Sequence, residues 1–489
     1  MMAGARPLVA ARAFSAGVTF LIPLVLARLL ALGSYGTFKQ FFLVSHTLYF
    51  ALALGIPQSL YYFLPRCAEA ERRPYLGQTL LYLAVAGGLS GGALYLCTPF
   101  LSWVGGPDLV AMRAPMALYC GLLLGGGALE AGLTAQGRPG HAAFAYIGSD
   151  TAKMLAYVIP AWLGFGLHGV LWGGALYAAL RALASWIVLV LPLRGPLFRR
   201  ELSRGQLRYA LPFGGAMLVG MPQQQLHQYV VSVTSSPAVF AVYSVGCFNL
   251  PVVDLLYTPT TELLMYRIGE LERRQRPDGE AAVLFRDAVA NLAYVFVPIA
   301  AGLFAIAPSF LSLLYTPKFL DAAPILRLAL GMVVLACLPV DGVLRAKAKT
   351  RALLAANVAK LGLTVPLVVG LNHAFGPVGA MAGFVLTETV HRLVLLALAA
   401  RALVPSAAAE GRLRGTLAAV GRVLPGVELV RAAVAAAGAG LVALFAGGYA
   451  ALDPLPSVLV LGTGFWIAYF GALVLVGVRP SAVLARIRG

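Results

Sequence analysis

The sequence predicts an all-α, polytopic membrane protein. Of its 489 residues, 60% are hydrophobic and only 11% are charged, and the mean hydropathy is +0.84. Apolar runs of about 18 residues or more recur along the whole chain, and a helix needs roughly 20 to cross a bilayer. We expect helices because lipid cannot satisfy open backbone polar groups, and the alternating pattern of a membrane barrel is absent.

Fourteen apolar runs are predicted to span the membrane. The first is too long for the core of a signal peptide and has no small-residue cleavage site, so we expect it to be a retained helix. The runs lie near residues 7–32, 38–64, 76–103, 109–136, 139–165, 168–193, 207–234, 237–266, 283–314, 322–346, 351–372, 376–402, 429–452 and 456–478.

Basic residues predict the orientation of these spans. With the N-terminus inside, 28 of the 37 lysines and arginines fall on cytoplasmic loops or helix ends, four flank the outer side and five lie within spans. Because cytoplasmic flanks collect basic residues, both termini are predicted to be cytoplasmic. The net charge of +18 then requires no nucleic acid, since it follows from this bias, which also attracts anionic membrane lipids.

Two pairs of motifs indicate an internal repeat. "YGTF" (35–38) is followed by "FAVY" (240–243), with aromatic residues at both ends. "GLHGVLWGG" has glycines at 166, 169 and 173, and "GPVGAMAGF" has them at 376, 379 and 383. The similar offsets predict two six-helix lobes in the same orientation, with a substrate cavity between them.

Lysines in the fifth and eleventh spans extend the repeat. Lys153 in "DTAKMLAYVIP" (150–160) is matched with Lys360 in "NVAKLGLTVP" (357–366). The predicted divisions are an N-terminal lobe (1–205), a C-terminal lobe (206–405), a basic cytoplasmic linker (406–428) and two additional transmembrane helices (429–489).

The linker is compatible with either a helix lying at the cytoplasmic interface or a solvated basic loop. A helix would place apolar residues on one face and arginines on the other. The apolar set is Leu413, Leu417, Val420 and Leu424, and the basic set is Arg412, Arg414 and Arg422.

Several segments resemble bacterial polysaccharide-biosynthesis flippases of the Wzx type, in the superfamily of lipid II flippases and multidrug-and-toxin extruders. The first is "RLLALGSYGTFKQFFLVSHTLYFALALGIPQSLYYFLPR" (28–66), with its "YG" and "LGIPQSL". "LRYALPF" (207–213), "APILRLALG" (323–331) and "FGPVGAMAGFVL" (375–386) support it in the second half. One departure is that many relatives carry an acid and then a base late in the seventh helix, where this chain has His227 and Gln228.

The resemblance implies two six-helix lobes around a central cavity. It also implies a multi-pass protein of the bacterial inner membrane that moves an undecaprenyl-diphosphate-linked oligosaccharide to the outer face by alternating access. O-antigen, exopolysaccharide or capsule assembly would be the pathway, with a polysaccharide polymerase and chain-length machinery as partners. A monomer without cofactor or metal is expected, coupled to a proton gradient, a sodium gradient or the membrane potential.

Arginines within or near the spans are candidates for holding a diphosphate, because charges inside a bilayer usually face a cavity or a partner. Arg28 lies in the first predicted span before the turn, and that span is expected to line the cavity; snorkelling to the outer interface is its alternative. Arg12 lies near the inner end, where the positive-inside bias is the simpler explanation. Arg181 and Arg392 follow the two glycine motifs, and Arg392 has Glu388 four residues before it as a possible partner.

Lys153 and Lys360 are candidates for the same cavity. Asp150 precedes Lys153 by three residues, which predicts a local ion pair, whereas Asn357 takes that position before Lys360. His46 and His227 could bind cargo or titrate, or could simply be hydrogen-bonded in packing. Asp254, Glu262, Glu130 and Asp341 are the candidates for ion coupling.

Two other functions stay open at this level. A cation-coupled drug or metabolite antiporter of the same fold would favour an acidic cavity, whereas bases and acids within these spans are roughly equal in number. A membrane-embedded glycan polymerase or ligase would need a sizeable outer loop for its chemistry, and all predicted outer loops are short. We therefore expect a transporter rather than an enzyme.

Overall fold

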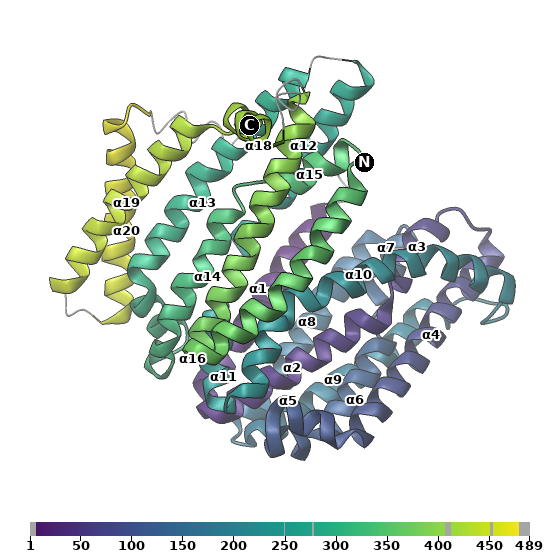
Figure 1. Cartoon of the computed structure of the whole chain (residues 1–489). Coiled ribbons are helices and arrows are strands. Elements are labelled where there is room, and N and C mark those ends of the chain that lie inside the picture. The colour runs from purple at the N-terminus through teal and green to yellow at the C-terminus, as the bar shows by residue number, and fades with distance from the viewer. Residues whose placement is uncertain (1–5, 249, 276–277, 406–411, 450–452, 479–489) are drawn as a thin grey trace. The chain divides into compact units, whose positions relative to one another are not determined.

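The computed structural model of the protein describes residues 6–248, 250–275, 278–405, 412–449 and 453–478, which form helices joined by turns and short loops. The chain divides into two compact units, unit 1 (Met1–Ala241) and unit 2 (Val242–Gly489). Figure 1 shows unit 1 in purple to teal and unit 2 in teal to yellow.

The helices of unit 1 are numbered as in Figure 1. They are α1 (Arg6–Leu29), α2 (Leu32–Ala53), α3 (Ile56–Phe63), α4 (Glu69–Leu96), α5 (Thr98–Ala111), α6 (Arg113–Gly125), α7 (Leu129–Ala135), α8 (Pro139–Trp162), α9 (Gly166–Leu189) and α10 (Arg200–Thr234), and α11 (Pro237–Gly246) crosses into unit 2.

The helices of unit 2 after α11 follow the same numbering. They are α12 (Pro251–Arg273), α13 (Asp278–Leu314), the 3-10 helix η2 (Pro317–Ala322), α14 (Ala323–Leu335), α15 (Val340–Ala346), α16 (Thr350–Leu403), α18 (Arg412–Val423), α19 (Gly426–Tyr449) and α20 (Pro454–Leu475).

The all-α membrane fold is confirmed. Each of the fourteen predicted runs coincides with helix over most of its length, although several spans consist of two helices separated by a bend. Within the described ranges, nine helices are long and apolar enough to cross a membrane, or up to eleven if each bent pair counts as one span. One of the nine, α16, contains two predicted spans. The count of fourteen and the cytoplasmic termini stay predictions.

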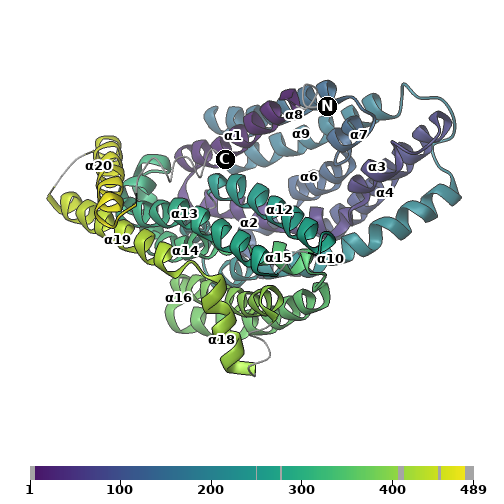
Figure 2. The same ribbon diagram turned by 90° about the horizontal axis from the view of Figure 1, so that it is seen from above.

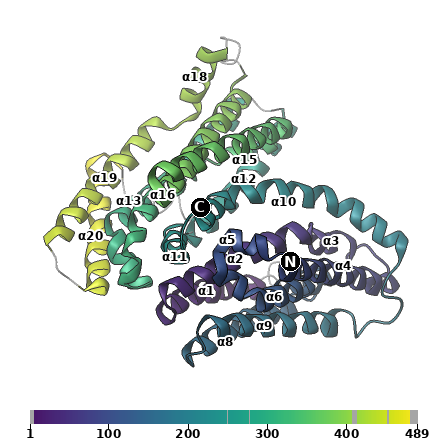
Figure 3. The same ribbon diagram turned by 60° about the horizontal axis from the view of Figure 1, so that its bottom comes forward.

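Unit 1 is a bundle in which helices distant in sequence pack side by side. Helix α1 packs against α8, α8 against α9, and α6 against both α4 and α9 (Figure 3). Buried leucines of α4, α6 and α7, among them Leu80, Leu124 and Leu133, form its main hydrophobic core. This packing fixes the helices α2, α8 and α9, which carry most of the site described below.

Unit 2 contains the two additional C-terminal helices. Helices α19 and α20 pack on α13 (Figure 2). The contact uses buried alanines of α19, including Ala432, Ala436 and Ala439, together with Phe465 and Tyr469 of α20. Small residues allow the backbones of membrane helices to approach closely, which is how an alanine-rich helix holds its place here.

Helix α10 explains why the compact units divide later than the predicted repeat. The repeat places the boundary after residue 205, but α10 packs against α2, α3 and α5 and so belongs to unit 1. Gly214 of α10 lies against the backbone of Leu54, where the chain breaks between α2 and α3. A side chain at this position would collide with that bend, since an added Cβ would be 2.4 Å from the Leu54 carbonyl oxygen.

The repeated glycines form the same tight helical hairpin in each unit. Gly166 and Gly376 have positive φ angles of 58° and 61° and make the turns. Gly173 then lies against the backbone of Ala156, and Gly383 lies against that of Leu367. The glycine pattern therefore records two structural needs, a left-handed turn and a close contact between helices.

Helix α18 confirms helical structure in the described part of the predicted linker, whose residues 406–411 lie outside the described ranges. It packs on α16 and buries Ala419 and Val423 (Figure 2). Leu413 and Leu417 are instead 75% and 64% exposed. Val420 and Leu424 of the predicted apolar face pack against the same core. The predicted face is therefore partly buried, and its two exposed leucines suit the predicted position at a membrane interface.

Candidate functional site

Unit 1 contains a partly open cavity of about 450 Å³ between α1, α2, α6, α7, α8 and α9. A smaller cavity of about 210 Å³ shares five lining residues with it, so we treat the two as one site. The shared residues are Tyr49, Phe50, Glu130, Tyr146 and Arg181. We call this site the unit 1 cavity.

An ion pair between α9 and α7 forms one wall of the unit 1 cavity. Two guanidinium nitrogens of Arg181 donate to the two carboxylate oxygens of Glu130, at 2.8 and 2.6 Å. Arg181 also donates to the hydroxyl of Ser149, which lies 3.1 Å from the Tyr177 hydroxyl. The two charged side chains are only 14% and 8% exposed. A bidentate pair of this kind gives both charges a partner away from water.

A second ion pair lies on α8. The Lys153 ammonium is 3.2 Å from a carboxylate oxygen of Asp150, which confirms the pair predicted from their spacing. The other Asp150 oxygen accepts a hydrogen bond from Ser15 of α1, and Lys153 lies 3.5 Å from the Thr19 hydroxyl. Asp150 and Lys153 therefore also connect α8 to α1.

Unit 2 carries a comparable network. Arg392 lies 3.2 Å from Glu388 and 3.5 Å from Asp341 of α15. The Tyr257 hydroxyl donates to Asp341 at 3.0 Å and accepts from Arg392 at 3.1 Å. Lys360 pairs with Glu388. Unlike Lys153, Lys360 has no acid three residues before it in the sequence, and its partner comes instead from the second half of the same hairpin.

The two arginines lie within one residue of equivalent positions in their hairpins, whereas the two lysines differ by three residues. Arg181 follows Gly166 by 15 residues, and Arg392 follows Gly376 by 16. Lys153 precedes its glycine by 13 residues and Lys360 precedes its own by 16. Three residues are about 4.5 Å along a helix. The predicted match between the lysines is therefore displaced by almost one helical turn.

The other basic candidates lie at different distances from the cavity. Arg12 places its guanidinium 5.5 Å from the centre of the Tyr146 ring, at the margin of the site. Arg28 is exposed in the last turn of α1 and lines neither part of the unit 1 cavity. His46 lines the larger cavity, with its Nδ1 3.0 Å from Gln225 of α10. His227 is buried in α10, away from the cavity lining.

The four acidic candidates separate into two groups. Glu130 and Asp341 are partners of the arginines, as described above. Asp254 and Glu262 are exposed on α12 and take no part in the unit 2 network.

Aromatic residues are the part of the site that the sequence prediction missed. The larger cavity is lined by six of them, Phe42, Tyr49, Phe50, Tyr119, Tyr146 and Tyr177. A signal was present, because Phe42, His46 and Phe50 follow one another at intervals of four residues, and Tyr146 precedes Asp150 by four. This spacing places each set on one helical face.

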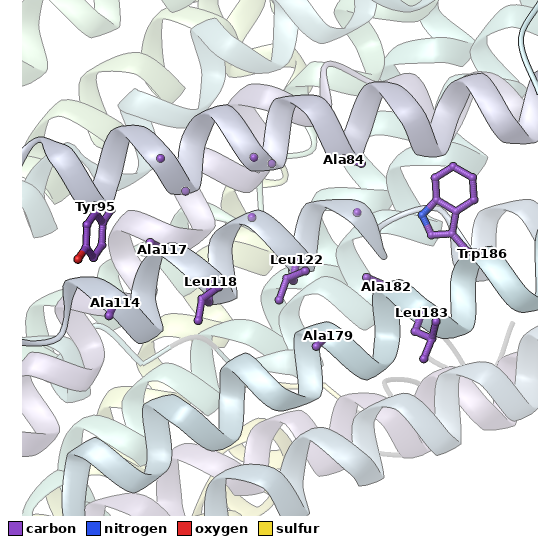
Figure 4. A pocket seen from close by; sticks show the side chains of 16 residues that line it. Ala84, Tyr95, Ala114, Ala117, Leu118, Leu122, Ala179, Ala182, Leu183 and Trp186 are labelled. Carbon is purple, nitrogen blue, oxygen red and sulfur yellow. The ribbon is translucent and has the colours of Figure 1, made fainter.

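A second hollow of unit 1 has a different character. It measures about 810 Å³ and lies along α4, α6 and α9 (Figure 4). Glycines, alanines and leucines line it, and Tyr95 and Trp186 stand at opposite ends. Only these two of its 16 lining residues carry a polar side-chain atom. The hollow therefore lacks groups to orient a polar cargo, unlike the unit 1 cavity.

Lys153→Gln is expected to cost less stability than the loss of one member of the Arg181–Glu130 pair. Lys153 and Asp150 share one contact and are 18% and 17% exposed, whereas Arg181 and Glu130 share two hydrogen bonds and are 14% and 8% exposed. Asp150 also keeps its bond from Ser15. Thermal unfolding of the purified protein should therefore shift by only a few degrees, while export measured in cells reports on cargo contact. A collapse in stability would show that Lys153 holds the bundle together.

Comparisons with known proteins bear on this architecture. A family model described as polysaccharide biosynthesis protein matches residues 25–324, which is more than half of the chain. The chain belongs to this polysaccharide biosynthesis family. Comparison with curated protein sequences gave no match.

Solved structures of other proteins show which fold this chain has. The lipid II flippase MurJ in an inward-closed conformation matches with a TM-score of 0.64 and 12% identity, over 94% of this chain and 99% of that one. An inward-facing MATE multidrug resistance transporter of the MOP superfamily matches with a TM-score of 0.63 and 16% identity, over 79% of this chain and 94% of that one. A MOP superfamily transporter from Pyrococcus furiosus matches with a TM-score of 0.52 and 14% identity, over 82% of this chain and 95% of that one. The chain is thus a multi-pass membrane protein with a transporter fold.

Proposed function

We propose that the protein is a flippase that moves an undecaprenyl-diphosphate-linked oligosaccharide from the cytoplasmic to the outer face of the bacterial inner membrane. The observation that carries the proposal is the match to the polysaccharide biosynthesis family on a fold shared with a lipid II flippase. O-antigen, exopolysaccharide or capsule assembly would use the product, through a polymerase and chain-length machinery. Alternating access, driven by an ion gradient or the membrane potential, is the proposed mechanism.

The unit 1 cavity supports this proposal over an antiporter for cationic drugs. Its carboxylates, Glu130 and Asp150, are each engaged by a base. A cationic cargo would have to displace Arg181 or Lys153 to obtain a free negative charge. A polar cargo without positive charge requires no such exchange.

Transport by the purified full chain tests the proposal. Proteoliposomes would contain undecaprenyl-diphosphate-linked oligosaccharide with a fluorophore on its sugar, and dithionite added outside destroys only exposed label. We expect the protein to move labelled cargo from the inner to the outer leaflet. Dithionite should then destroy more of the fluorescence than it does in protein-free vesicles. Vesicles with imposed proton or sodium gradients would identify the coupling ion.

Ethidium uptake in the same vesicles tests the antiporter. Ethidium accumulation along an imposed gradient, with no additional loss of sugar label, would overturn the flippase and favour a drug antiporter. A labelled phospholipid without sugar controls for leakage and non-specific scrambling, which must stay at the level of protein-free vesicles.

A further inference from the structure

We propose that the unit 1 cavity binds an uncharged sugar ring of the cargo and not its diphosphate. The inference rests on the proposed flippase function and assigns one part of the cargo to one cavity. It differs from the expectation that bases within the spans hold the headgroup. Three observations support it, namely the charge balance, the aromatic lining and the contrast with unit 2.

The charge balance of the cavity does not suit a diphosphate. Its charged lining consists of two bases, Arg181 and Lys153, and two acids, Glu130 and Asp150. Each base is paired, and both nitrogens of the Arg181 fork face Glu130. A diphosphate would have to displace carboxylates and would then face two of them. Anion binding at such a site is opposed by like-charge repulsion in a medium of low dielectric constant.

The same groups suit hydroxyls. A carboxylate has about four lone-pair sites and a guanidinium has five donors, so paired groups keep capacity for further hydrogen bonds. A sugar hydroxyl both donates and accepts, and it adds no charge. Ser45 and Thr19 also line the cavity and supply neutral hydroxyls. The paired groups therefore make the cavity polar and add no net charge to it. A site of this kind suits a polyol.

Aromatic rings provide the second requirement for a sugar. The C–H groups on one face of a pyranose are weakly positive and pack on the negative face of an aromatic ring. Tyr146 and Phe50 are partly exposed rings that line both parts of the cavity. The volume of about 450 Å³ lies within the range of roughly 300–1,000 Å³ for small-molecule sites. It accommodates a short piece of glycan and not a polymer.

Unit 2 shows which features serve the fold. The arginine–acid pair and a neighbouring tyrosine occur in both units, as Arg181, Glu130 and Tyr49 in unit 1 and as Arg392, Asp341 and Tyr257 in unit 2. Because the ion pair and its neighbouring tyrosine occur in both units, the structural repeat explains them.

One partly exposed aromatic residue of the cavity has no such repetition. Counted from the hairpin glycines, Tyr146 corresponds to Ala356. Packing of the repeated hairpin therefore does not require a ring at this position. Tyr177 also lines the cavity, but it is only 5% exposed and its hydroxyl lies 3.1 Å from that of Ser149, so packing explains it. The partly exposed Tyr146 is the ring that points to a ligand.

Saturation-transfer NMR on the full chain in detergent micelles tests the assignment. The probes are methyl α-D-glucopyranoside, methyl N-acetyl-β-D-glucosaminide and inorganic pyrophosphate. We expect transfer to the ring protons of at least one glycoside, with no displacement by pyrophosphate. Tyr146→Leu should lower the affinity by about tenfold, equivalent to about 1.4 kcal/mol. Tyr146→Phe, which retains the ring, should bind like the parent.

A matched control and two opposite outcomes make the test decisive. Trp103→Leu removes an exposed ring of α5 outside the cavity lining and should leave glycoside binding unchanged. Displacement by pyrophosphate, or equal binding by Tyr146→Leu, would overturn the sugar assignment. If Tyr146→Leu also transports normally in the vesicle assay, the flippase function stands and only this inference fails. If glycosides bind at Tyr146 but no lipid-linked cargo moves, the proposed function fails instead.

Discussion

Glu130→Gln is expected to destabilise the protein severely, because it leaves the Arg181 guanidinium buried opposite a neutral group. Arg181 is 14% exposed, and both of its terminal nitrogens bond to Glu130. Removing one member of a buried ion pair costs about 3–5 kcal/mol, whereas removing both charges costs much less. Thermal unfolding of the purified full chain should show a large loss for Glu130→Gln and partial recovery in Glu130→Gln/Arg181→Gln.

The control for this prediction is another glutamate. Glu262 is exposed on α12, and Glu262→Gln should stay within about 0.5 kcal/mol of the parent, as expected for a surface substitution. A normal unfolding temperature for Glu130→Gln would contradict a structural ion pair. If folding were unchanged and only transport fell, Glu130 would instead act on the cargo or on a coupling ion.

Patterns within one helix were predictable from the sequence. The apolar runs identified the helical segments, and the glycines at 166 and 376 identified equivalent turns because only a residue without a side chain readily adopts those φ angles. The Lys153–Asp150 pair was predictable because both residues lie on one helical face. Each of these features depends on neighbours close in the chain.

Contacts between helices were not predictable in the same way. Glu130 lies 51 residues before Arg181, and no local spacing connects them. Lys360 reaches Glu388 only because the chain reverses at Gly376. The position of α10 in unit 1 likewise depends on packing against α2 and α3, which the repeat pattern does not encode. The aromatic lining had a helical spacing, but in an apolar sequence such spacing does not separate a cavity from a packed core.

Gly173→Ala is expected to destabilise the protein even though alanine is the better helix former. An added Cβ would lie 1.9 Å from the carbonyl oxygen of Ala156 in the neighbouring helix, so backbone would have to move. Overpacking of a well-packed interior costs about 1–3 kcal/mol, and a backbone contact leaves little room for relief. The hairpin of α8 and α9 should then open, which would also disturb Arg181 and Tyr146. Unfolding temperature and glycoside binding should both fall.

Gly148→Ala tests whether the loss comes from the contact and not from the substitution itself. Gly148 is a helical glycine of α8 with no atom within 4 Å of an added Cβ. In open helix, replacing glycine by alanine stabilises by about 0.5–1 kcal/mol, so the two variants should shift the unfolding temperature in opposite directions. A gain in both would refute the close approach at Gly173. A loss in Gly173→Ala alone would assign the repeated glycine to helix contact, because the gain in helix propensity is the same at both positions.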